Sequence, residues 1–126
     1  MKIFARAALA VSAVMFVAKP ALADVVAAAK AKWHVGETVT VEGVVSEVHT
    51  SRFGGTTFIC IGDAYSNDAF TAVVFAHRSA AVGDLSGLAG KTVDIVGMIQ
   101  NYEGAPEIII SARDQIRVRR NQVSAR

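Results

Sequence analysis

The side chains best suited to binding chemistry are aromatic rings and an arginine in parts of the sequence expected to form loops. Arg52 and Phe53 precede a pair of glycines, Tyr65 lies in the polar stretch GDAYSND, and Tyr102 follows Asn101 just before the turn-forming EGAP. Aromatic rings can stack on single-stranded bases for about 1–3 kcal/mol each, and arginine can contact phosphate. The structural alternatives are that Tyr65 packs under its own loop and that Tyr102 caps one end of the fold.

Phe58 is a further candidate, at the start of an apolar run that ends at Ile61. In a strand its ring would lie on one face, and Ile59 and Ile61 would lie on the other. Stacking on a ligand and packing in the core are therefore both open for Phe58. Cys60 is the only cysteine, so it cannot form an intrachain disulfide, and we expect a packed thiol.

The sequence lacks the patterns that most catalytic and metal sites require. It contains no Gly-x-Ser-x-Gly motif and no evident pairing of a nucleophile with a base. The three histidines and Cys60 do not have the spacing of metal ligands. Gly90-Lys91-Thr92 resembles the end of a phosphate-binding loop, but Leu85 stands where that loop needs a glycine. We therefore expect a binding module, not an enzyme, with no catalytic residue, metal or cofactor.

β-Strands are the elements expected to position these residues. Val39 and Val41 alternate with threonines, which predicts a strand from about Glu37 to His49 with one buried face. Gly43 interrupts this strand, and the pair Val44-Val45 then shifts the apolar phase. We predict a bulge or a sharp bend at Gly43, a common device for closing a small barrel.

Four more strands and one short helix follow. The segment 36–45 is echoed by the segment 90–99, since each begins with a glycine turn and has a glycine in mid-strand, Gly43 and Gly97. A short helix is expected between the third and fourth strands, within residues 77–91. The fold predicted is an all-β, five-stranded Greek-key barrel. After the first strand, its strands are Thr57–Ile61, Phe70–Ala76, Thr92–Tyr102, and Glu107–Ser111 with an extension to Val118.

These stretches resemble the OB-fold family of nucleic-acid-binding proteins, especially bacterial exported single-domain OB-fold proteins and the OB modules of some secreted nucleases. The resemblance covers Gly36–Val118 and departs at Ser66, where those relatives have a proline after the tyrosine. It implies an OB-fold barrel whose ligand lies on the second and third strands and the flanking loops. The stretches that carry it are Val39–Val45, His49–Arg52, Phe58–Asp63, Phe70–Phe75 and Pro106–Ile110.

The spacing from Phe58 to Asp63 is also similar to the anticodon-binding OB domain of class II aminoacyl-tRNA synthetases. In that family the phenylalanine stacks on a base, which implies the same role for Phe58. Ala72 stands where those relatives have a base-reading polar side chain, so sequence-specific recognition is not expected. The nucleic-acid-binding residues expected are Arg52, Phe53, Phe58, Tyr65, Asn101 and Tyr102.

Residues 1–23 have the organisation of a signal peptide. Lys2 and Arg6 form a basic start, residues 7–18 are an apolar stretch, and Ala21-Leu22-Ala23 offers the small residues of a cleavage site. Twelve apolar residues are too few to span a hydrocarbon core about 30 Å thick, so we expect cleavage and no stable membrane insertion afterwards. The predicted localisation is periplasmic or secreted.

Charge is distributed unevenly along the rest of the chain. Residues 24–112 carry five Lys and Arg against ten Asp and Glu, whereas residues 113–126 carry five arginines against one acid. We expect a short helical or flexible lead-in at 24–35, the barrel at 36–118, and a basic tail at 119–126. The tail can favour phosphate or remain solvated without a partner.

Two functions from different classes fit this sequence. The first is binding of single-stranded DNA or RNA through the second and third strands, with little sequence specificity. The second is that of an exported stress-type OB-fold protein, which binds a small cationic ligand or a periplasmic protein partner. The first is the function predicted, on the basis of the aromatic candidates and Arg52. The second is the alternative, and the excess of acids in residues 24–112 supports it, because negative charge repels a polyanion.

Overall fold

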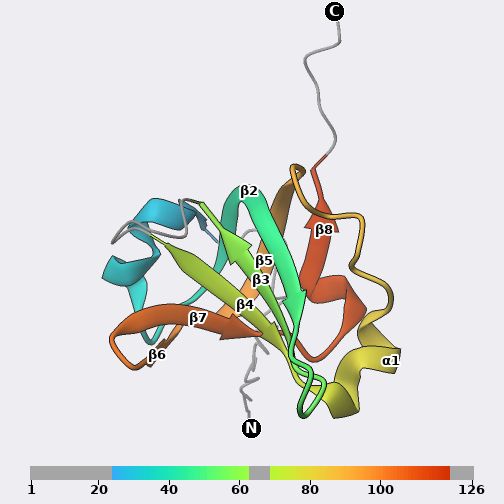
Figure 1. Cartoon of the computed structure of the whole chain (residues 1–126). Helices are drawn as coiled ribbons and strands as arrows, with labels where there is room; N and C mark the ends of the chain where they lie inside the picture. Colours follow the sequence, from blue (N-terminus) through green and yellow to red (C-terminus); the bar gives the residue numbers. More distant parts are fainter. Residues whose placement is uncertain (1–23, 63–68, 120–126) are drawn as a thin grey trace, which may run out of the picture.

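A computed structural model of the chain describes residues 24–62 and 69–119 (Figure 1). The predicted signal peptide, Tyr65 and residues 120–126 of the predicted tail lie outside the described residues. No helix in the two described ranges is long and apolar enough to cross a membrane.

The described residues form one eight-stranded, mostly antiparallel sheet. Its strands pair in the order β6-β7-β4-β3-β2-β5-β8, and β1 pairs with β2 beside this path. The pairing of β4 with β7 and of β1 with β2 is parallel. The strands are β1 (Val25–Ala27), β2 (Thr38–Thr50), β3 (Thr57–Ile61), β4 (Phe70–Val74), β5 (Thr92–Met98), β6 (Gln100–Tyr102), β7 (Ala105–Ile109) and β8 (Ile116–Val118).

Within the described residues, helical structure is confined to short segments at the ends of strands. The 3-10 helix η2 (Ala28–His34) follows β1, and η3 (Ala76–Arg78) leads into α1 (Ser79–Val82) after β4. A third 3-10 helix, η4 (Arg113–Gln115), separates β7 from β8. The all-β fold class and the short helix between the third and fourth predicted strands are therefore confirmed.

The predicted barrel of five strands is corrected in two places. The fourth predicted strand is divided at Ile99 into β5 and β6, because the backbone of Ile99 bonds to Gly36 and Glu37 instead of continuing the ladder. The fifth is divided by η4, where the side-chain oxygen of Gln115 accepts the N–H groups of Ser111 and Ala112. The pairing path ends at β6 and β8, so the sheet is not closed by a continuous ladder.

The segment 24–35, expected as a short helical or flexible lead-in, consists of β1 and η2. Val25 pairs with Thr40 of β2, and Ala28 and Ala31 of η2 are buried in the core. β1 occupies the side of β2 that β3 does not reach, because β3 pairs only with the second half of β2.

The bulge predicted at Gly43 lies instead at Ser46. Val39, Val41 and Val45 are all buried, so the apolar phase continues through Gly43, while Val44 is exposed. The register between β2 and β3 shifts between Val45 and Glu47, and the phase changes there. Gly43 has another reason to be a glycine: a Cβ on it would overlap Cγ2 of Ile61 and lie 3.1 Å from Cβ of Ala28.

The core lies between the two curved halves of the sheet and is made of aliphatic side chains and one phenylalanine. β3 contributes Ile59 and Ile61, and β4 contributes Phe70, Ala72 and Val74. Among the described residues no polar or charged side chain is buried. Burial of these apolar side chains, at about 25 cal/mol per Å² removed from water, holds the strands in place.

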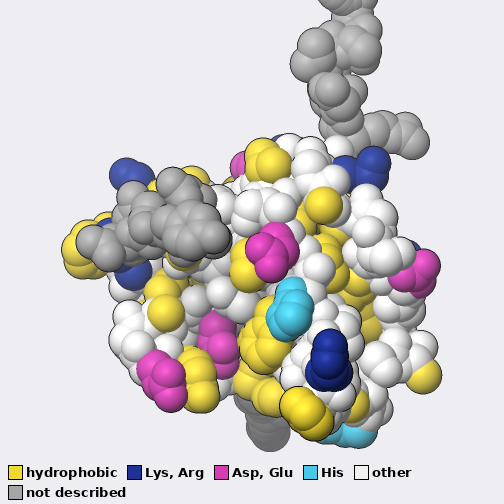
Figure 2. All heavy atoms as spheres, in the orientation of Figure 1, with side chains coloured by type: hydrophobic (Ala, Val, Ile, Leu, Met, Phe, Trp, Pro, Cys, Tyr) yellow, Lys and Arg dark blue, Asp and Glu magenta, His cyan; other side chains and the backbone are white. Residues whose placement is uncertain are grey.

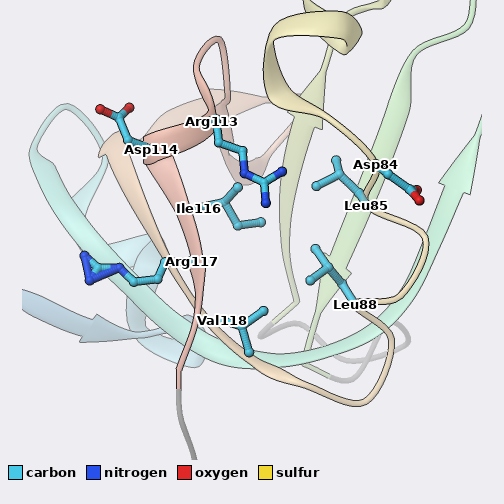
Figure 3. Close-up of a pocket in the computed structure, with 8 residues that line it drawn as sticks. All are labelled: Asp84, Leu85, Leu88, Arg113, Asp114, Ile116, Arg117 and Val118. Carbon is cyan, nitrogen blue, oxygen red and sulfur yellow. The ribbon is translucent and has the colours of Figure 1, made fainter.

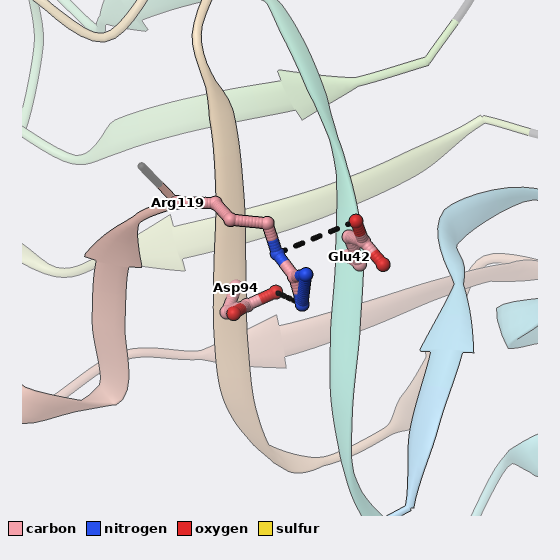
Figure 4. A network of polar contacts seen from close by, with 3 residues as sticks. All are labelled: Glu42, Asp94 and Arg119. Carbon is pink, nitrogen blue, oxygen red and sulfur yellow. Dashed lines mark hydrogen bonds and ion pairs between the residues drawn. The ribbon is translucent and has the colours of Figure 1, made fainter. Parts of the chain in front are cut away.

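The first residue of the predicted tail, Arg119, is tied to the sheet. Its Nε lies 3.4 Å from the carboxylate of Glu42, and its Nη2 lies 3.3 Å from that of Asp94 (Figure 4). Glu42 and Asp94 are opposite each other in the ladder between β2 and β5, so Arg119 neutralises two facing acids. This arginine is consequently engaged within the fold.

Candidate ligand-binding face

The outer face of β3 and β4 carries the first of the expected site residues, Phe58. Side chains alternate along a strand, and Ile59 and Ile61 are fully buried, so Phe58 and Cys60 point away from the core. Phe58 is half-buried on this outer face. Of the two possibilities that the sequence left open, packing in the core is therefore ruled out for Phe58.

The ring of Phe58 is supported by a histidine from the neighbouring strand. His49 is its direct partner in the ladder between β2 and β3. The two rings are stacked, with centroids 6.3 Å apart and planes inclined by 20°. Sequence reasoning missed His49 as a member of this face, although its place at the end of the first predicted strand put it opposite the start of the second.

Phe58 and Tyr102 line the same pocket, which has a volume of about 170 Å³ and which we call the aromatic pocket. Tyr102 comes from β6 and is 59% exposed. The parallel pairing of β4 with β7, and the antiparallel pairing of β7 with β6, bring this tyrosine across the sheet toward β3. The remaining lining residues are Thr71, Ala105, Pro106 and Glu107.

Glu107 gives the aromatic pocket an acid that the sequence analysis did not assign to the site. It pairs with Thr71 on β4 and with Gln100 on β6. Partial burial raises the pKa of this carboxyl above its usual value, because desolvation disfavours the charged form. The missed signal was the two-residue period of the fifth strand, in which Ile108 is buried and Glu107 must face outward.

Asn101, another expected ligand residue, shapes the turn between β6 and β7. Its Oδ1 accepts a hydrogen bond of 2.9 Å from the backbone N–H of Gly104. Glu103 and Gly104 both have positive φ, at 51° and 85°, as a tight hairpin turn requires. Asn101 therefore fixes the position of Tyr102 and does not line the aromatic pocket.

Arg52 and Phe53 lie at the exposed tip of the loop between β2 and β3. Phe53 is 85% exposed, and Arg52 is also exposed. The loop is held at its base, where Ser51 N–H donates to the carbonyl of Thr56, and the Ser51 hydroxyl donates to the carbonyl of Phe53. Neither residue lines the aromatic pocket, so these two side chains border the face and do not join its centre.

The face also contains the single thiol and a second acid. Cys60 pairs with Thr71 on one side and with Glu47 on the other. Burial, and secondarily the Glu47 carboxylate, raise the pKa of the Cys60 thiol, so the thiol and not the thiolate is the main form at neutral pH. Figure 2, viewed from the side on which β3 and β4 lie in front, shows hydrophobic side chains interspersed with acidic ones and a histidine.

The chemistry available on this face is binding chemistry. Two aromatic rings, a hydroxyl, a histidine and a carboxylate can stack on, hydrogen-bond to and attract a ligand. In the ranges 24–62 and 69–119, no group of three or more His, Cys, Asp and Glu side chains is placed to hold a metal ion.

Comparison with known proteins gives structural relatives only. No protein-family model matches the chain, and no curated protein matches it by sequence. A protein described as an aspartyl-tRNA synthetase of Leishmania major is similar over 86% of this chain and 23% of its own, with a TM-score of 0.55 and 14% identity. The structure of yeast Stn1 and Ten1 is similar over 69% of this chain and 45% of the matched chain, with a TM-score of 0.51 and 19% identity.

A third relative is the OBody AM1L10 bound to hen egg-white lysozyme. It is similar over 71% of this chain and 86% of its own, with a TM-score of 0.50 and 19% identity. The chain spans less than half the length of the first two relatives. These likenesses concern the fold alone, and they confirm the predicted one: the chain has an OB-like fold.

Proposed function

We propose that the chain is an exported, non-enzymatic OB-fold protein that binds single-stranded DNA or RNA across β3 and β4 with little sequence preference. The observation that carries this proposal is that Phe58 and Tyr102 open into one pocket on the outer face of the sheet. A base stacked on either ring gains about 1–3 kcal/mol whatever its identity, because every base has a π-face.

The polar groups of the face are consistent with weak discrimination between bases. Ala72, at the position where the synthetase relatives read a base, points into the core and is fully buried. The outward-facing polar side chain next to it is Thr71, whose single hydroxyl can both donate and accept. A group that both donates and accepts favours no one base edge, so recognition relies on stacking.

The charges on the face set an upper limit on affinity. Arg52 is the only Lys or Arg in residues 38–74 and 100–109, which include β2, β3, β4, β6 and β7. Release of counterions from one phosphate contact gives a salt slope of about −0.7 for a single strand. We therefore expect weak binding, with a shallow dependence on salt that Arg52 accounts for.

A small cationic ligand is the second candidate, and Glu107 is the observation that favours it. Two aromatic rings with a half-buried carboxylate between strands are a suitable environment for an ammonium group, through cation–π attraction and charge. The same carboxylate repels a phosphate backbone. The two candidates therefore predict opposite effects of removing the Glu107 charge.

The test consists of two titrations of the full chain. Binding of fluorescently labelled oligo-dT and oligo-U is measured by fluorescence anisotropy at low salt, and binding of spermidine is measured by calorimetry. Phe58→Ala and Tyr102→Ala are each expected to weaken oligonucleotide binding about tenfold. Arg52→Gln is expected to flatten the salt slope. Trp33→Ala, which removes an exposed aromatic ring outside the aromatic pocket, is the matched control and leaves affinity unchanged.

Glu107→Gln decides between the two candidates. Tighter oligonucleotide binding by this variant supports the nucleic-acid proposal. Weaker spermidine binding, together with no measurable oligonucleotide binding by the unmodified chain, assigns the pocket to a cation and overturns it. Cys60 gives an independent reading, since its thiol lies on the same face and should react more slowly with a disulfide reagent when the ligand is bound.

A further inference from the structure

A second pocket lies on another part of the molecule, between β8 and the segment that follows α1. Leu85 and Leu88 form one wall, and Ile116 and Val118 of β8 form the other, around a space of about 450 Å³ that we call the β8 slot. Figure 3 shows these four side chains pointing toward one another across the slot. No residue lines both the β8 slot and the aromatic pocket.

The β8 slot has a cation at one end. Figure 3 shows the guanidinium of Arg113 turned into the slot toward Leu85 and Ile116, while the carboxylates of Asp84 and Asp114 point away. Arg117 also lines the rim, but its guanidinium extends to the other side of β8. The positive charge that a ligand in the slot would meet is therefore that of Arg113.

Arg113 is held in place by the backbone that ends α1. One of its terminal nitrogens, Nη1, donates a hydrogen bond of 2.8 Å to the carbonyl of Val82. Gly83, with φ of 95°, leaves the space, since a Cβ there would lie 2.7 Å from that nitrogen. This is the only polar contact of the guanidinium within the described residues, so four of its five N–H donors are available to a ligand.

We propose that the β8 slot binds a small carboxylate with an apolar body, the carboxylate on Arg113 and the body between the leucines and β8. A volume of about 450 Å³ is within the range of small-molecule sites, which are mostly apolar with a few placed polar groups. The planar fork of arginine matches a carboxylate in two parallel hydrogen bonds. The two arginines and two aspartates of the rim cancel in formal charge, which disfavours a polyanion.

The experiment is a titration of the full chain with sodium octanoate. Binding is measured from the chemical shifts of the methyl NMR signals of the four residues that form the walls of the slot, Leu85, Leu88, Ile116 and Val118. Octanol provides the same apolar body without the charge. A short peptide ending in leucine, with a free or an amidated C-terminus, tests whether the carboxylate belongs to a chain end. The expected result is a saturable shift of the slot methyls with octanoate and a much weaker one with octanol.

Three variants separate binding from folding. Arg113→Gln is expected to weaken octanoate binding about tenfold or more, since a charge-assisted hydrogen bond is lost. Val118→Asp places a repelling charge at a site that is 46% exposed, so it should abolish binding and leave the protein folded. Arg117→Gln removes the same charge from the other side of β8 and should leave binding unchanged.

Particular outcomes would overturn the proposal. Equal binding of octanol and octanoate, or no saturable shift in the millimolar range, shows that Arg113 serves only to cap α1. Binding of the free-ended peptide but not of octanoate assigns the slot to a peptide chain end and rejects the small acid.

Loss of oligonucleotide binding in Phe58→Ala with octanoate binding retained would show that the two sites are independent.

Discussion

Gly43 of β2 lies so close to Ile61 of β3 that a Cβ on the glycine would overlap Cγ2 of the isoleucine. The same glycine approaches Cβ of Ala28 in η2, so the side chains of Ile61 and Ala28 pack directly against the β2 backbone. Gly97 of β5 has the equivalent relationship with Ile108 of β7, where a Cβ would lie 2.6 Å from Cγ2. Gly43 and Gly97, the two mid-strand glycines of the repeated sequence pattern, are thus both places where the sheet folds over itself.

Replacing Gly43 should therefore destabilise the fold through overpacking. We expect Gly43→Ala to lower the free energy of unfolding by about 1–3 kcal/mol, and Gly43→Val to lower it further. Gly87→Ala is the matched control, since no atom lies within 4 Å of the added Cβ, and it should be neutral or slightly stabilising. The measurement is denaturant unfolding, and an unchanged midpoint for Gly43→Ala would contradict the close packing.

The strands could be predicted from the sequence because their two-residue period is strong. Thr57–Ile61 was predicted with the bounds that β3 has, and the repeated pattern singled out Gly43 and Gly97, which the structure shows to be close approaches and not the bulge predicted at Gly43. The bulge was misplaced because Val44 and Val45 are both apolar, and only pairing with β3 decides which one is buried. The break between β7 and β8 depends on the Gln115 side chain, which bonds backbone groups that would otherwise extend a ladder.

The candidate site was only partly predictable from the sequence, because part of it depends on how the strands pair. The aromatic types of Phe58 and Tyr102 indicated stacking, and the structure brings both to one pocket. His49 and Glu107 join them through cross-strand register, which no single stretch of sequence contains. The role expected for Tyr65 lies outside the described residues and stays a prediction.

Phe58→Ala should cost little stability if its ring serves the outer face. A half-buried phenylalanine that loses its contact with His49 should lower the free energy of unfolding by about 1–2 kcal/mol. Ile59→Ala, one residue away and fully buried, is expected to cost about 2–5 kcal/mol. Parallel denaturant melts compare the two, and an equal loss of stability for both would show that the Phe58 ring contributes as much to folding as a core side chain, against a ligand-binding role.

The pKa of Glu107 gives the face a dependence on pH. Because burial raises this pKa in the folded state, the protonated Glu107 stabilises the fold, and this contribution is fully present below the ordinary pKa of a glutamate. That contribution is lost as pH rises through the raised folded pKa. Glu107→Gln lacks it, so the stability of this variant relative to the unmodified chain should increase across the same interval.

Oligonucleotide affinity should follow the same titration. As pH falls through the raised pKa, Glu107 becomes neutral and its repulsion of phosphate ends, so binding by the unmodified chain should tighten. Glu107→Gln retains His49 and every other titrating group, so the difference between the two proteins isolates Glu107. Glu103→Gln, in the adjacent turn and outside the pocket, is the charge-matched control. A pH profile identical in the unmodified chain and Glu107→Gln would remove Glu107 from the binding face.

Export should remove residues 1–23 and leave Asp24 as the first residue. The basic start, the apolar stretch 7–18 and the Ala21-Leu22-Ala23 site motivate this expectation. Asp24 itself belongs to the fold, because its carbonyl accepts a hydrogen bond of 2.9 Å from Thr40 N–H, so cleavage before it leaves this contact intact. Intact-mass measurement of protein recovered from a bacterial periplasm tests the site. Ala23→Arg should block cleavage and leave the precursor, whereas finding Met1 on the unmodified periplasmic protein would refute the assignment.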